Sequence, residues 1–475
     1  MTIRLGRTRH IHFVGIGGIG MSGIAELLAN LGYSVSGSDA RRSEITDRLA
    51  SLGVRIAIGH AADHIGDADV VVTSSAVAPD NPEVAAARAR HTPVIPRAEM
   101  LAELMRLRTG IAIAGAHGKT TTTSMIALVL EKAGLDPTAV IGGRLSAFGS
   151  NARLGSSQYM VAEADESDRS FLLLSPTFAV ITNIDHEHME SYGSFDHLVD
   201  AFVQFANAVP FYGAVIACID DPVVASLLPR LKRRVITYGF SEQADVRGEA
   251  PSSDGRSARC MVRTWTDAAQ READRQELVL GVPGRHNLLN ALAATAMARE
   301  LDVPSVRIAE ALKVFHGAER RYQVRGVVND VTVVDDYGHH PTEIAAVLRT
   351  AREGHPRRLI VAFQPHRYSR TRDLLPEFGP ALKDADVVVL TDIYAASEAP
   401  IPGISLDTLA GAVRPHVPEL MQVPSVGDLP GHLALLAQPG DLVITLGAGS
   451  IGLTADRLVG LLQQMAGQVG SEGVS

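Results

Sequence analysis

The sequence predicts an α/β protein of three domains, and three observations support this expectation. The chain has 475 residues, which at roughly 100–200 residues per domain favours about three domains. Short β-branched runs alternate with helical patterns, as in parallel sheets covered by helices. Two glycine-rich turns each follow a predicted buried strand and open a helix, and parallel sheets bind ligands at such turns.

Composition narrows the class of protein. The 53 Asp+Glu exceed the 44 Lys+Arg, for a formal net charge of -9, which argues against nucleic acid as a partner. The 46% hydrophobic and 20% charged residues are typical of globular proteins and exclude a disordered chain. The two cysteines, Cys218 and Cys260, form no CxxC motif. The sequence therefore excludes a disulfide framework and a zinc ribbon, and it fits a reducing compartment.

Two apolar segments imitate targeting signals. Residues 11–24 follow several arginines, as in a signal peptide, but His12 and repeated glycines interrupt the run. Ala201–Ile219 is uncharged over the length of a membrane span, but Pro210 and its neighbours indicate a turn between a helix and a strand. We expect no membrane insertion and a cytoplasmic location.

The first domain is predicted over residues 1–108, as a Rossmann-like unit. Its β-branched runs are typical of buried parallel strands, with helices between them. The predicted strands are Ile11–Val14, Ser34–Ser38 and Val70–Thr73, and the predicted helices are Ile19–Leu31, Glu44–Leu52 and Ala98–Arg106.

A P-loop-type central domain is predicted over residues 109–317 and a Rossmann-like C-terminal domain over residues 318–475. The central domain ends in a β-meander that contains Ala258–Trp265 and Gln276–Leu280. Its other predicted strands are Ile111–Ala114, Tyr159–Ala162, Phe178–Ile181, Ala214–Ile219 and Arg234–Tyr238. Those of the C-terminal domain are Val331–Asp335, Arg358–Phe363, Val387–Leu390 and Leu442–Leu446.

The first glycine-rich turn predicts a site for a nucleotide diphosphate. Gly15, Gly17, Gly18 and Gly20 lie between a strand and a helix, and Asp39 ends the next strand. Glycines allow close approach of the backbone, and the helix N-terminus offers N–H groups to a pyrophosphate. The alternative is a strand–turn–helix that only packs. NAD is the default ligand for such a turn, but the motif does not identify the base.

The second turn, Gly-Ala-His-Gly-Lys-Thr-Thr-Thr at residues 115–122, predicts a phosphate-binding loop and an ATPase domain. It departs from the usual P-loop because Ile113 stands where that pattern has glycine. Lys119 can neutralise phosphate charge, and the Thr120 hydroxyl can bind Mg²⁺. The alternative is a solvent-exposed Gly-Lys turn.

Acidic and histidine side chains follow two further strands of the central domain, at residues 163–168 and 182–188. Because parallel strands end at one edge of a sheet, these side chains can hold Mg²⁺ beside the phosphate loop. Each run alone could equally be a solvated turn. A zinc-protease site is excluded, because Glu190 breaks the HExxH spacing that His186 would begin.

Arginines and histidines cluster after later strands. The clusters are residues 281–291, 315–321, 335–342 and 363–371. Such side chains suit anionic ligands, with phosphate the best partner for a bidentate arginine. A single arginine of this kind is more often part of a surface ion pair, so the prediction rests on the repetition.

Together these motifs resemble the Mur ligases of peptidoglycan synthesis over nearly the whole chain. The resemblance rests on Gly-Ile-Gly-Gly-Ile-Gly-Met-Ser-Gly (15–23), Gly-x-His-Gly-Lys-Thr-Thr-Thr (115–122), Asp-Asp-Tyr-Gly-His-His-Pro-Thr (335–342), Gln-Pro-His-Arg-Tyr-Ser-Arg-Thr (364–371) and Tyr-Ala-Ala-x-Glu-x-Pro-Ile-x-Gly (394–403). It is closest to the members that join L-alanine to UDP-N-acetylmuramate. A UDP sugar thus replaces NAD as the expected ligand of the first turn.

The resemblance implies a three-domain, ATP-dependent ligase that serves cell-wall biogenesis, cell shape and cell division. ATP would phosphorylate the lactyl carboxylate of UDP-N-acetylmuramate to an acyl phosphate, which the amine of L-alanine attacks. Mg²⁺ would be the metal, with Mn²⁺ as an alternative. We expect a monomer or weak homodimer.

The resemblance also implies roles for individual residues. Those that bind the UDP substrate would be Gly15, Gly17, Gly18, Gly20, Asp39, His60 and Ser75. Those that bind ATP would be Gly115, Ala116, His117, Gly118, Lys119, Thr120, Thr121, His286, Asn287, Asn290, Arg321 and Asp336. Metal ligands would be Thr120, Glu163 and His188, and the catalytic residues would be Lys119, Glu163, His188 and Arg321. The amino-acid site would comprise Tyr337, His340, Arg367 and Arg370, with His366 and Glu398 nearby.

The sequence departs from the family pattern in three ways. Ala116 replaces the usual threonine, and Glu187 stands where the family usually has aspartate. No lysine lies between Lys132 and Lys232, so we expect no carbamylated lysine of the kind that several other Mur ligases carry.

Two alternatives remain open. One is the recycling ligase of the same family, which attaches a preformed peptide to UDP-N-acetylmuramate; the 335–342 and 364–371 segments favour the L-alanine enzyme. The other is a dinucleotide-binding oxidoreductase or sensor, which has no use for Lys119 and Thr120.

Overall fold

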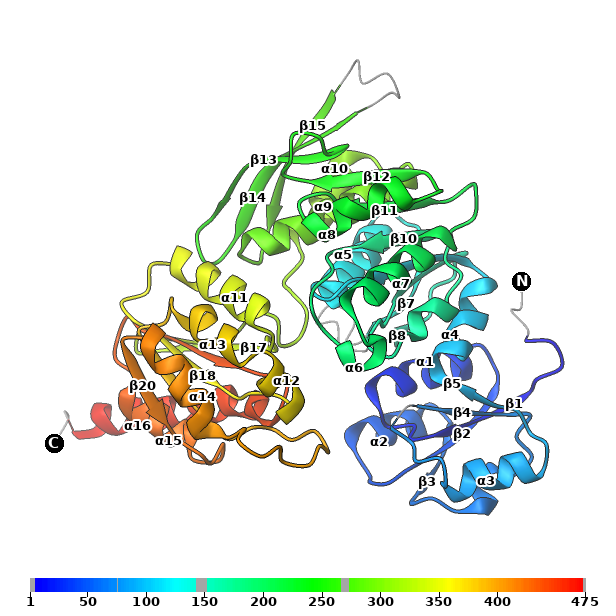
Figure 1. The fold of residues 1–475 in the computed structure, drawn as a ribbon, viewed down its shortest axis with the longest axis horizontal. Helices are drawn as coiled ribbons and strands as arrows, with labels where there is room; N and C mark the ends of the chain where they lie inside the picture. The colour runs from blue at the N-terminus through cyan, green and yellow to red at the C-terminus, as the bar shows by residue number, and fades with distance from the viewer. Residues whose placement is uncertain (1–4, 75, 142–151, 266–272, 473–475) are drawn as a thin grey trace. The chain divides into compact units, whose positions relative to one another are not determined.

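The computed structural model describes residues 5–74, 76–141, 152–265 and 273–472. Within these ranges the chain forms three sheets with helices packed against them (Figure 1). The chain divides into two compact units. The first consists of Met1–Ala250, Cys260–Val279 and Leu289–Phe315, and the second consists of Pro251–Arg259, Leu280–Leu288 and His316–Ser475.

The N-terminal sheet is parallel and has the strand order β3-β2-β1-β4-β5. From β1 the chain first adds β2 and β3 on one side of β1, and it then adds β4 and β5 on the other side. This reversal makes the carboxyl ends of β1 and β4 the place where such sheets bind ligands. The strands are β1 (His10–Val14), β2 (Ser34–Asp39), β3 (Arg55–Ile58), β4 (Val70–Thr73) and β5 (Val94–Pro96). The helices are α1 (Ile19–Asn30), α2 (Glu44–Ser51), α3 (Pro82–Ala89) and α4 (Arg97–Arg106).

Strand β1 is buried on both faces, and its side chains alternate between two clusters. Ile11 and Phe13 pack in the larger cluster, which includes buried residues of α1 and α4. Val14 packs in a smaller cluster that contains Ala87 of α3. Because alternation puts His12 on the same face as Val14, a histidine points from the sheet toward α3.

The central sheet has ten strands in the order β15-β14-β13-β12-β11-β10-β6-β9-β7-β8. The consecutive neighbours β13, β14 and β15 form the expected meander at one edge (Figure 1). The strands are β6 (Thr109–Ala114), β7 (Thr138–Val140), β8 (Ala152–Arg153), β9 (Tyr159–Glu163), β10 (Phe178–Ile181), β11 (Ala214–Cys218), β12 (Val235–Gly239), β13 (Val246–Ser253), β14 (Ala258–Trp265) and β15 (Ala273–Leu280). The helices are α5 (Lys119–Lys132), α6 (Met189–Tyr192), α7 (Phe195–Asn207), α8 (Pro222–Leu227), α9 (Arg285–Glu300) and α10 (Ser305–Lys313).

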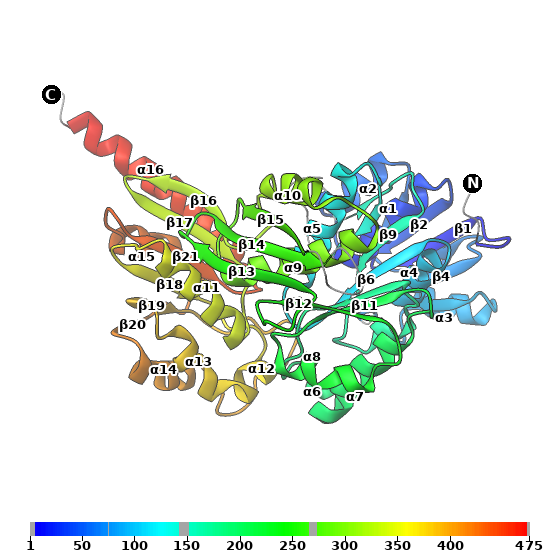
Figure 2. The same cartoon turned by 90° about the horizontal axis from the view of Figure 1, so that it is seen from above.

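The C-terminal sheet has the order β16-β17-β21-β18-β19-β20, parallel except for the β16–β17 hairpin. One hydrophobic cluster joins it to α11, α13 and α14, and another joins it to α15 and α16, so that helices cover both faces (Figure 2). The strands are β16 (Gln323–Val328), β17 (Val331–Asp336), β18 (Leu359–Phe363), β19 (Val387–Leu390), β20 (Glu419–Gln422) and β21 (Leu442–Leu446). The helices are α11 (Pro341–Glu353), α12 (Tyr368–Asp373), α13 (Leu375–Leu382), α14 (Leu406–Val413), α15 (Leu429–Leu436) and α16 (Thr454–Glu472).

The predicted strands therefore agree closely with the observed ones. The uncharged run Ala201–Ile219 is the end of α7, a turn and β11. Among the described helices, none has the length and apolar character that a membrane crossing needs.

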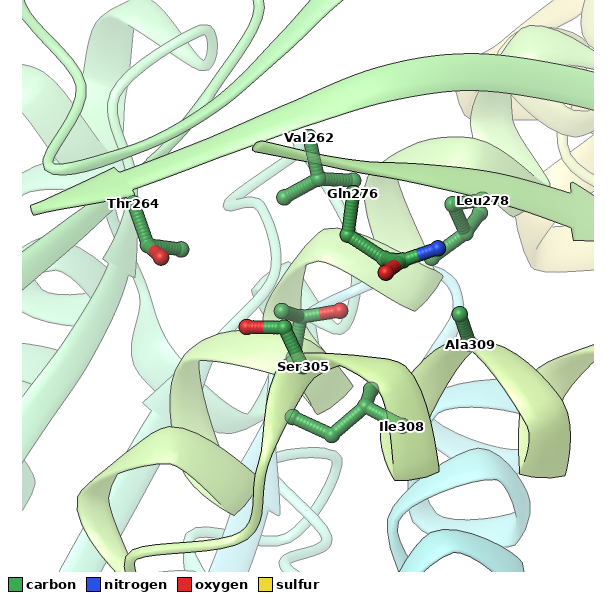
Figure 3. A pocket seen from close by; sticks show the side chains of 8 residues that line it. Val262, Thr264, Gln276, Leu278, Ser305, Ile308 and Ala309 are labelled. Atoms are coloured by element: carbon green, nitrogen blue, oxygen red, sulfur yellow. The ribbon is translucent and has the colours of Figure 1, made fainter. Parts of the chain in front are cut away.

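A small cavity of about 10 Å³ lies between the meander and the helices beneath it (Figure 3). Val262, Leu278 and Ile308 give it an apolar lining. Thr264 also lines it, and the Thr264 hydroxyl is buried without a hydrogen-bond partner among the described residues. A buried hydroxyl without a partner costs stability, because it loses its hydrogen bonds to water on folding.

We expect Thr264→Val to raise the free energy of unfolding by about 1 kcal/mol, because valine has nearly the same shape and no polar atom to desolvate. Thermal unfolding measures the change. Thr295→Val is the matched control, since Thr295 lines the same cavity but donates a hydrogen bond to Ala291 O at 2.8 Å. A melting temperature that falls in Thr264→Val and not in the control would refute the prediction.

Candidate active site

The phosphate-binding loop lies between β6 and α5 in a backbone conformation that requires its two glycines. Gly115 has φ +139° and Gly118 has φ +81°. A Cβ atom on Gly115 would lie 2.0 Å from Thr182 Oγ1, and one on Gly118 would lie 2.6 Å from Asn290 Oδ1. The loop is therefore closely packed against the end of β10 and against α9, and helix α5 begins immediately after it, at Lys119.

The segment after β10 holds the phosphate loop in shape. Asn183 Oδ1 accepts a hydrogen bond from His117 N at 2.8 Å, and the Asn183 side-chain amide and the Thr182 hydroxyl both donate to His117 O. The His117 ring lies 2.9 Å from the Asp185 carboxylate. Because β10 pairs in parallel with β6, the two strand ends are adjacent and these contacts follow from the sheet order.

Lys119 is the cation of the loop, and protein groups surround its ammonium. Its Nζ donates to Glu166 Oε1 at 2.8 Å, to Ala116 O at 3.1 Å and to Gly115 O. Burial alone would lower the pKa of Lys119, but the carboxylates of Glu166, Asp165 and Glu187 together outweigh it and raise that pKa, so Lys119 stays charged. Burial raises the pKa of Glu166 above its ordinary value, against the opposing effect of Lys119.

A candidate metal centre lies next to this ion pair. The ligand atoms of Glu166, Glu187 and His188 all lie within 4.8 Å of one another. Glu166 Oε2 is buried without a hydrogen-bond partner among the described residues, so this carboxylate oxygen can bind a cation. Carboxylates suit Mg²⁺ and Mn²⁺. Glu163, the carboxylate expected here, ends β9 in register with Ile113 and is not part of this group.

Other residues expected to bind ATP lie on α5 and α9. Thr120 and Thr121 occupy the first turn of α5. Asn290, on α9, accepts a hydrogen bond from the Thr122 hydroxyl at 3.1 Å and lies beside Gly118. The structure thus brings Asn290 to the phosphate loop, whereas the Asn287 side chain donates to Pro283 O at 2.7 Å.

Asp39 forms a hydrogen bond with the backbone of the first glycine-rich turn. The Asp39 carboxylate accepts a hydrogen bond from Gly17 N at 2.8 Å, and a Cβ atom on Gly17 would lie 2.8 Å from the same oxygen. Gly18 precedes α1 without a side-chain cap, so the helix begins with N–H groups that can face an anion. Ser75 lies outside the described residues.

A buried carboxylate, Glu83, holds His60 at the same edge of the sheet. The Glu83 side chain is 0% exposed and lies 2.7 Å from the His12 ring, 3.2 Å from His60 Nδ1 and 3.5 Å from His64 Nδ1. Ser38 donates to it at 2.8 Å. Burial would raise the pKa of Glu83, but the hydrogen bonds from His12, Ser38 and His60 hold it at about 2.

In the second unit, Arg321 and Asp336 lie at the end of β17. Arg321 donates to Glu343 at 3.1 Å, and its guanidinium lies 5.2 Å from the centre of the Tyr337 ring. Asp336 accepts hydrogen bonds from Tyr322 N and Gly338 N, and burial raises the pKa of Asp336 to about 6.

Two histidines of the second unit, the buried His340 and the half-buried His286, lie near these groups. His340 precedes α11 and caps it by accepting from Thr342 N. Burial, and then the charge of Arg321, lowers the pKa of His286 to about 4. The neutral imidazole can act as a hydrogen-bond partner without adding charge.

The start of α12 carries the arginines expected in the amino-acid site. Arg367 precedes the helix with φ +72°. The Ser369 amide and hydroxyl donate to Glu398 at 3.0 and 2.6 Å, which fixes the helix start. Arg370 lies 3.2 Å from the His366 ring. Burial lowers the pKa of His366 to about 3, and so do its cationic neighbours.

Comparison with known families accounts for this arrangement. Three family models match in sequence along the chain: "Mur ligase family, catalytic domain" over residues 10–109, "Mur ligase middle domain" over 113–298, and "Mur ligase, glutamate ligase domain" over 320–449. The chain belongs to the Mur ligase family.

Curated relatives agree with this assignment. A UDP-N-acetylmuramate–L-alanine ligase of Geobacter sulfurreducens is 55% identical over 463 residues, which is 97% of this chain and 99% of the relative. The enzyme of the same name from Trichlorobacter lovleyi is 56% identical, over 96% of this chain and 99% of its own.

Solved structures of Mur ligases have the same fold. UDP-N-acetylmuramate–alanine ligase MurC from Thermotoga maritima has a TM-score of 0.81 at 31% identity, covering 97% of this chain and 100% of that one. A murein peptide ligase from Psychrobacter arcticus has a TM-score of 0.70 at 25% identity, covering 96% and 98%. The predicted three-domain α/β fold class is confirmed.

Sequence reasoning missed three residues of this Mur ligase that the structure places at the site edges. Glu83 follows Asn-Pro and looks like an ordinary carboxylate at a helix start, and Arg97 looks like an ordinary charge before a helix. Glu166 lies in the acidic run 163–168 that was expected to hold Mg²⁺, but the family resemblance favoured Glu163 in that run. The alternation along β1 predicts that a buried His12 needs a polar partner, but it does not identify Glu83 as that partner.

We expect Glu83→Gln to lower the free energy of unfolding by about 3 kcal/mol at pH 7, because it removes the buried charge that His12 and His60 face. The native pKa of Glu83 is about 2, below its ordinary 4.5. Its stabilising effect is therefore present above pH 4.5 and is lost as the pH falls toward 2. The stability gap to the wild type should narrow over that range.

Urea unfolding at pH 7, 5, 4 and 3 measures the gap. Glu44→Gln is the control, since Glu44 is exposed at the start of α2. A gap that stays constant with pH would mean that the Glu83 charge is not what stabilises the domain.

Proposed function

We propose that this chain is an ATP-dependent ligase that joins L-alanine to the lactyl carboxylate of UDP-N-acetylmuramate, in peptidoglycan precursor synthesis. The observation that carries the proposal is the 55% identity, over 97% of the chain, to a relative named for this reaction. The phosphate-binding loop at the carboxyl edge of the central sheet supports it, since the reaction begins with phosphoryl transfer.

The reaction brings together two anions, the lactyl carboxylate of UDP-N-acetylmuramate and the phosphates of ATP. The lactyl carboxylate attacks the γ-phosphorus of ATP, the bond to the β-phosphate oxygen breaks, and an acyl phosphate and ADP result. The amine of L-alanine then attacks the acyl carbon, loses a proton, and phosphate leaves. Because carboxylate and ATP repel each other, cations must lie where the charge develops.

Lys119 is the cation proposed to bind the β- and γ-phosphates. In the structure its ammonium donates hydrogen bonds to Glu166 and to two backbone carbonyl groups. A bound phosphate would therefore take the place of one or more of these acceptors. The remaining ATP contacts proposed on this loop come from Gly115, Ala116, His117, Gly118, Thr120 and Thr121. Asn290 lies beside Gly118, which supports its place in the same site.

We also propose that Mg²⁺, or Mn²⁺ in its place, binds beside this loop. Glu166, Glu187 and His188 fit a divalent cation by their donor atoms and by the buried carboxylate oxygen of Glu166. Thr120 and Glu163 remain proposed ligands on the strength of the family pattern. When bound, the metal would neutralise phosphate charge.

The other substrates are proposed to bind at the remaining strand ends. The UDP moiety would take the first glycine-rich turn with Asp39 and His60. In the second unit, Arg321 and Asp336 would serve ATP, together with His286 and Asn287. L-alanine would contact Tyr337, His340, Arg367 and Arg370. We further propose a cytoplasmic enzyme that is a monomer or weak homodimer and binds no nucleic acid; its free cysteines, Cys218 and Cys260, support a reducing compartment.

The alternatives have less support. The murein peptide ligase of Psychrobacter arcticus, at 25% identity, is more distant than the L-alanine ligases. Every family model that matches describes a ligase domain or a ligase family, and an oxidoreductase would not need the Lys119 loop.

We expect phosphate release from ATP, with UDP-N-acetylmuramate present, to require L-alanine. L-serine and glycine should be poorer by only about 10–200-fold, because a small change in side chain is worth about 1–3 kcal/mol. A coupled phosphate assay measures turnover. Turnover with a tripeptide and not with L-alanine would favour the recycling ligase instead.

We expect Lys119→Ala to lower kcat by at least about 10²–10³-fold, because the lost cation faces charge that develops in the transition state. Affinity for UDP-N-acetylmuramate, measured by calorimetry, should change little. Lys132→Ala, at the exposed end of the same helix, is the control. Equal losses in turnover and in UDP-substrate affinity would contradict separate sites for ATP and the UDP substrate.

A further inference from the structure

The side chain of Arg97, which has no role in the family pattern described above, lies next to the first turn of α1. It is the first residue of α4, immediately after β5. A Cβ atom on Gly20 would lie 2.7 Å from Arg97 Nη1 and 3.2 Å from Arg97 Cζ. Gly20 therefore leaves room for the guanidinium. Its backbone angles do not require glycine, but the closeness of Arg97 does.

The guanidinium is only partly satisfied by protein groups. Its one hydrogen-bond partner among the described residues is Asp165, with Arg97 Nη2 3.5 Å from Asp165 Oδ2. That distance is at the limit for a hydrogen bond. Asp165 is also engaged elsewhere, because its Oδ1 accepts from Ser167 N at 3.0 Å. The Arg97 side chain is 25% exposed, so part of its guanidinium is accessible to a ligand.

Two features of the start of α1, beside Arg97, favour an anion. The first turn of α1 contains no acidic residue, and a helix N-terminus carries a partial positive charge. Arginine adds a full charge and a planar fork that matches two phosphate oxygens. Gly20 belongs to the turn proposed above for the UDP substrate, so this charge lies at the end of that turn.

Asp165 connects this position to the phosphate loop of the central domain. It precedes Glu166, which pairs with Lys119. The Arg97–Asp165 contact and the Lys119–Glu166 pair thus occupy adjacent residues of one loop. The Asp165 contact therefore links Arg97, at the start of α4, to the loop that also holds Lys119.

We propose that Arg97 binds the diphosphate of the UDP substrate, with Asp165 as the residue that positions it. This inference rests on the proposed function and adds a binding residue to it. Arg97 donates to diphosphate oxygens beside the N-terminus of α1, and so orients the sugar end toward the phosphate loop.

The test measures binding by calorimetry on the full chain without ATP, using UDP, UDP-N-acetylglucosamine and UDP-N-acetylmuramate. Arg97→Met should weaken all three by the same factor, about 10–100-fold, because all three contain the diphosphate. Arg97→Lys should lose less, because it retains the charge without the fork. The KM for ATP should stay within about twofold in both variants.

Arg106→Met is the matched control, since Arg106 ends the same helix and pairs with Glu103 at 2.8 Å on the surface. A loss confined to UDP-N-acetylmuramate would overturn the proposal, because only this ligand has the lactyl carboxylate. An equal loss in ATP affinity would overturn it too, as would full affinity for UDP in Arg97→Met. If the wild type bound none of the three ligands, the proposed function itself would fail.

Discussion

The buried ion pair between Lys119 and Glu166 is the interaction on which the central site depends. A lysine at the start of a helix that packs against a sheet cannot be desolvated without an anion. Glu166 supplies that anion at 2.8 Å, and the carbonyl groups of Gly115 and Ala116 take up the remaining donors. The loop therefore holds its cation in place, which lowers the cost of ordering it when phosphate binds.

The same physical requirement applies to other candidate site residues, within each unit taken by itself. In the first domain, Glu83 is buried and surrounded by His12, His60 and Ser38. In the second unit, Glu343 accepts from Arg321. Each of these carboxylates positions at least one residue that the family pattern assigns to a substrate. In the proposed scheme these acidic side chains do not contact a substrate. They hold in place the histidine and arginine side chains that do.

Much of the fold and part of the site could be predicted from the sequence. Strands such as β10 and β18 are buried on both faces, and continuous apolar runs of this kind are recognisable without structure. Gly115 and Gly118 were also predictable, because they belong to a recognisable glycine-rich motif. Their positive φ angles and close neighbours explain why these positions require glycine. The roles of Glu83, Arg97 and Glu166 were not predictable. Glu163 and Glu166 lie in one acidic run, and only the turn after β9 decides which of them faces Lys119.

The sequence by itself determined the family, the order of the strands along the chain and the two phosphate-binding turns, because these are local patterns of residue type and spacing. Only the tertiary structure decided which charges meet. Lys119 and Glu166 are 47 residues apart in the chain, Arg97 and Asp165 are 68 apart, and His12 and Glu83 are 71 apart. Such pairs form because the sheet order brings distant strand ends to one edge, where opposite charges offset the cost of leaving water.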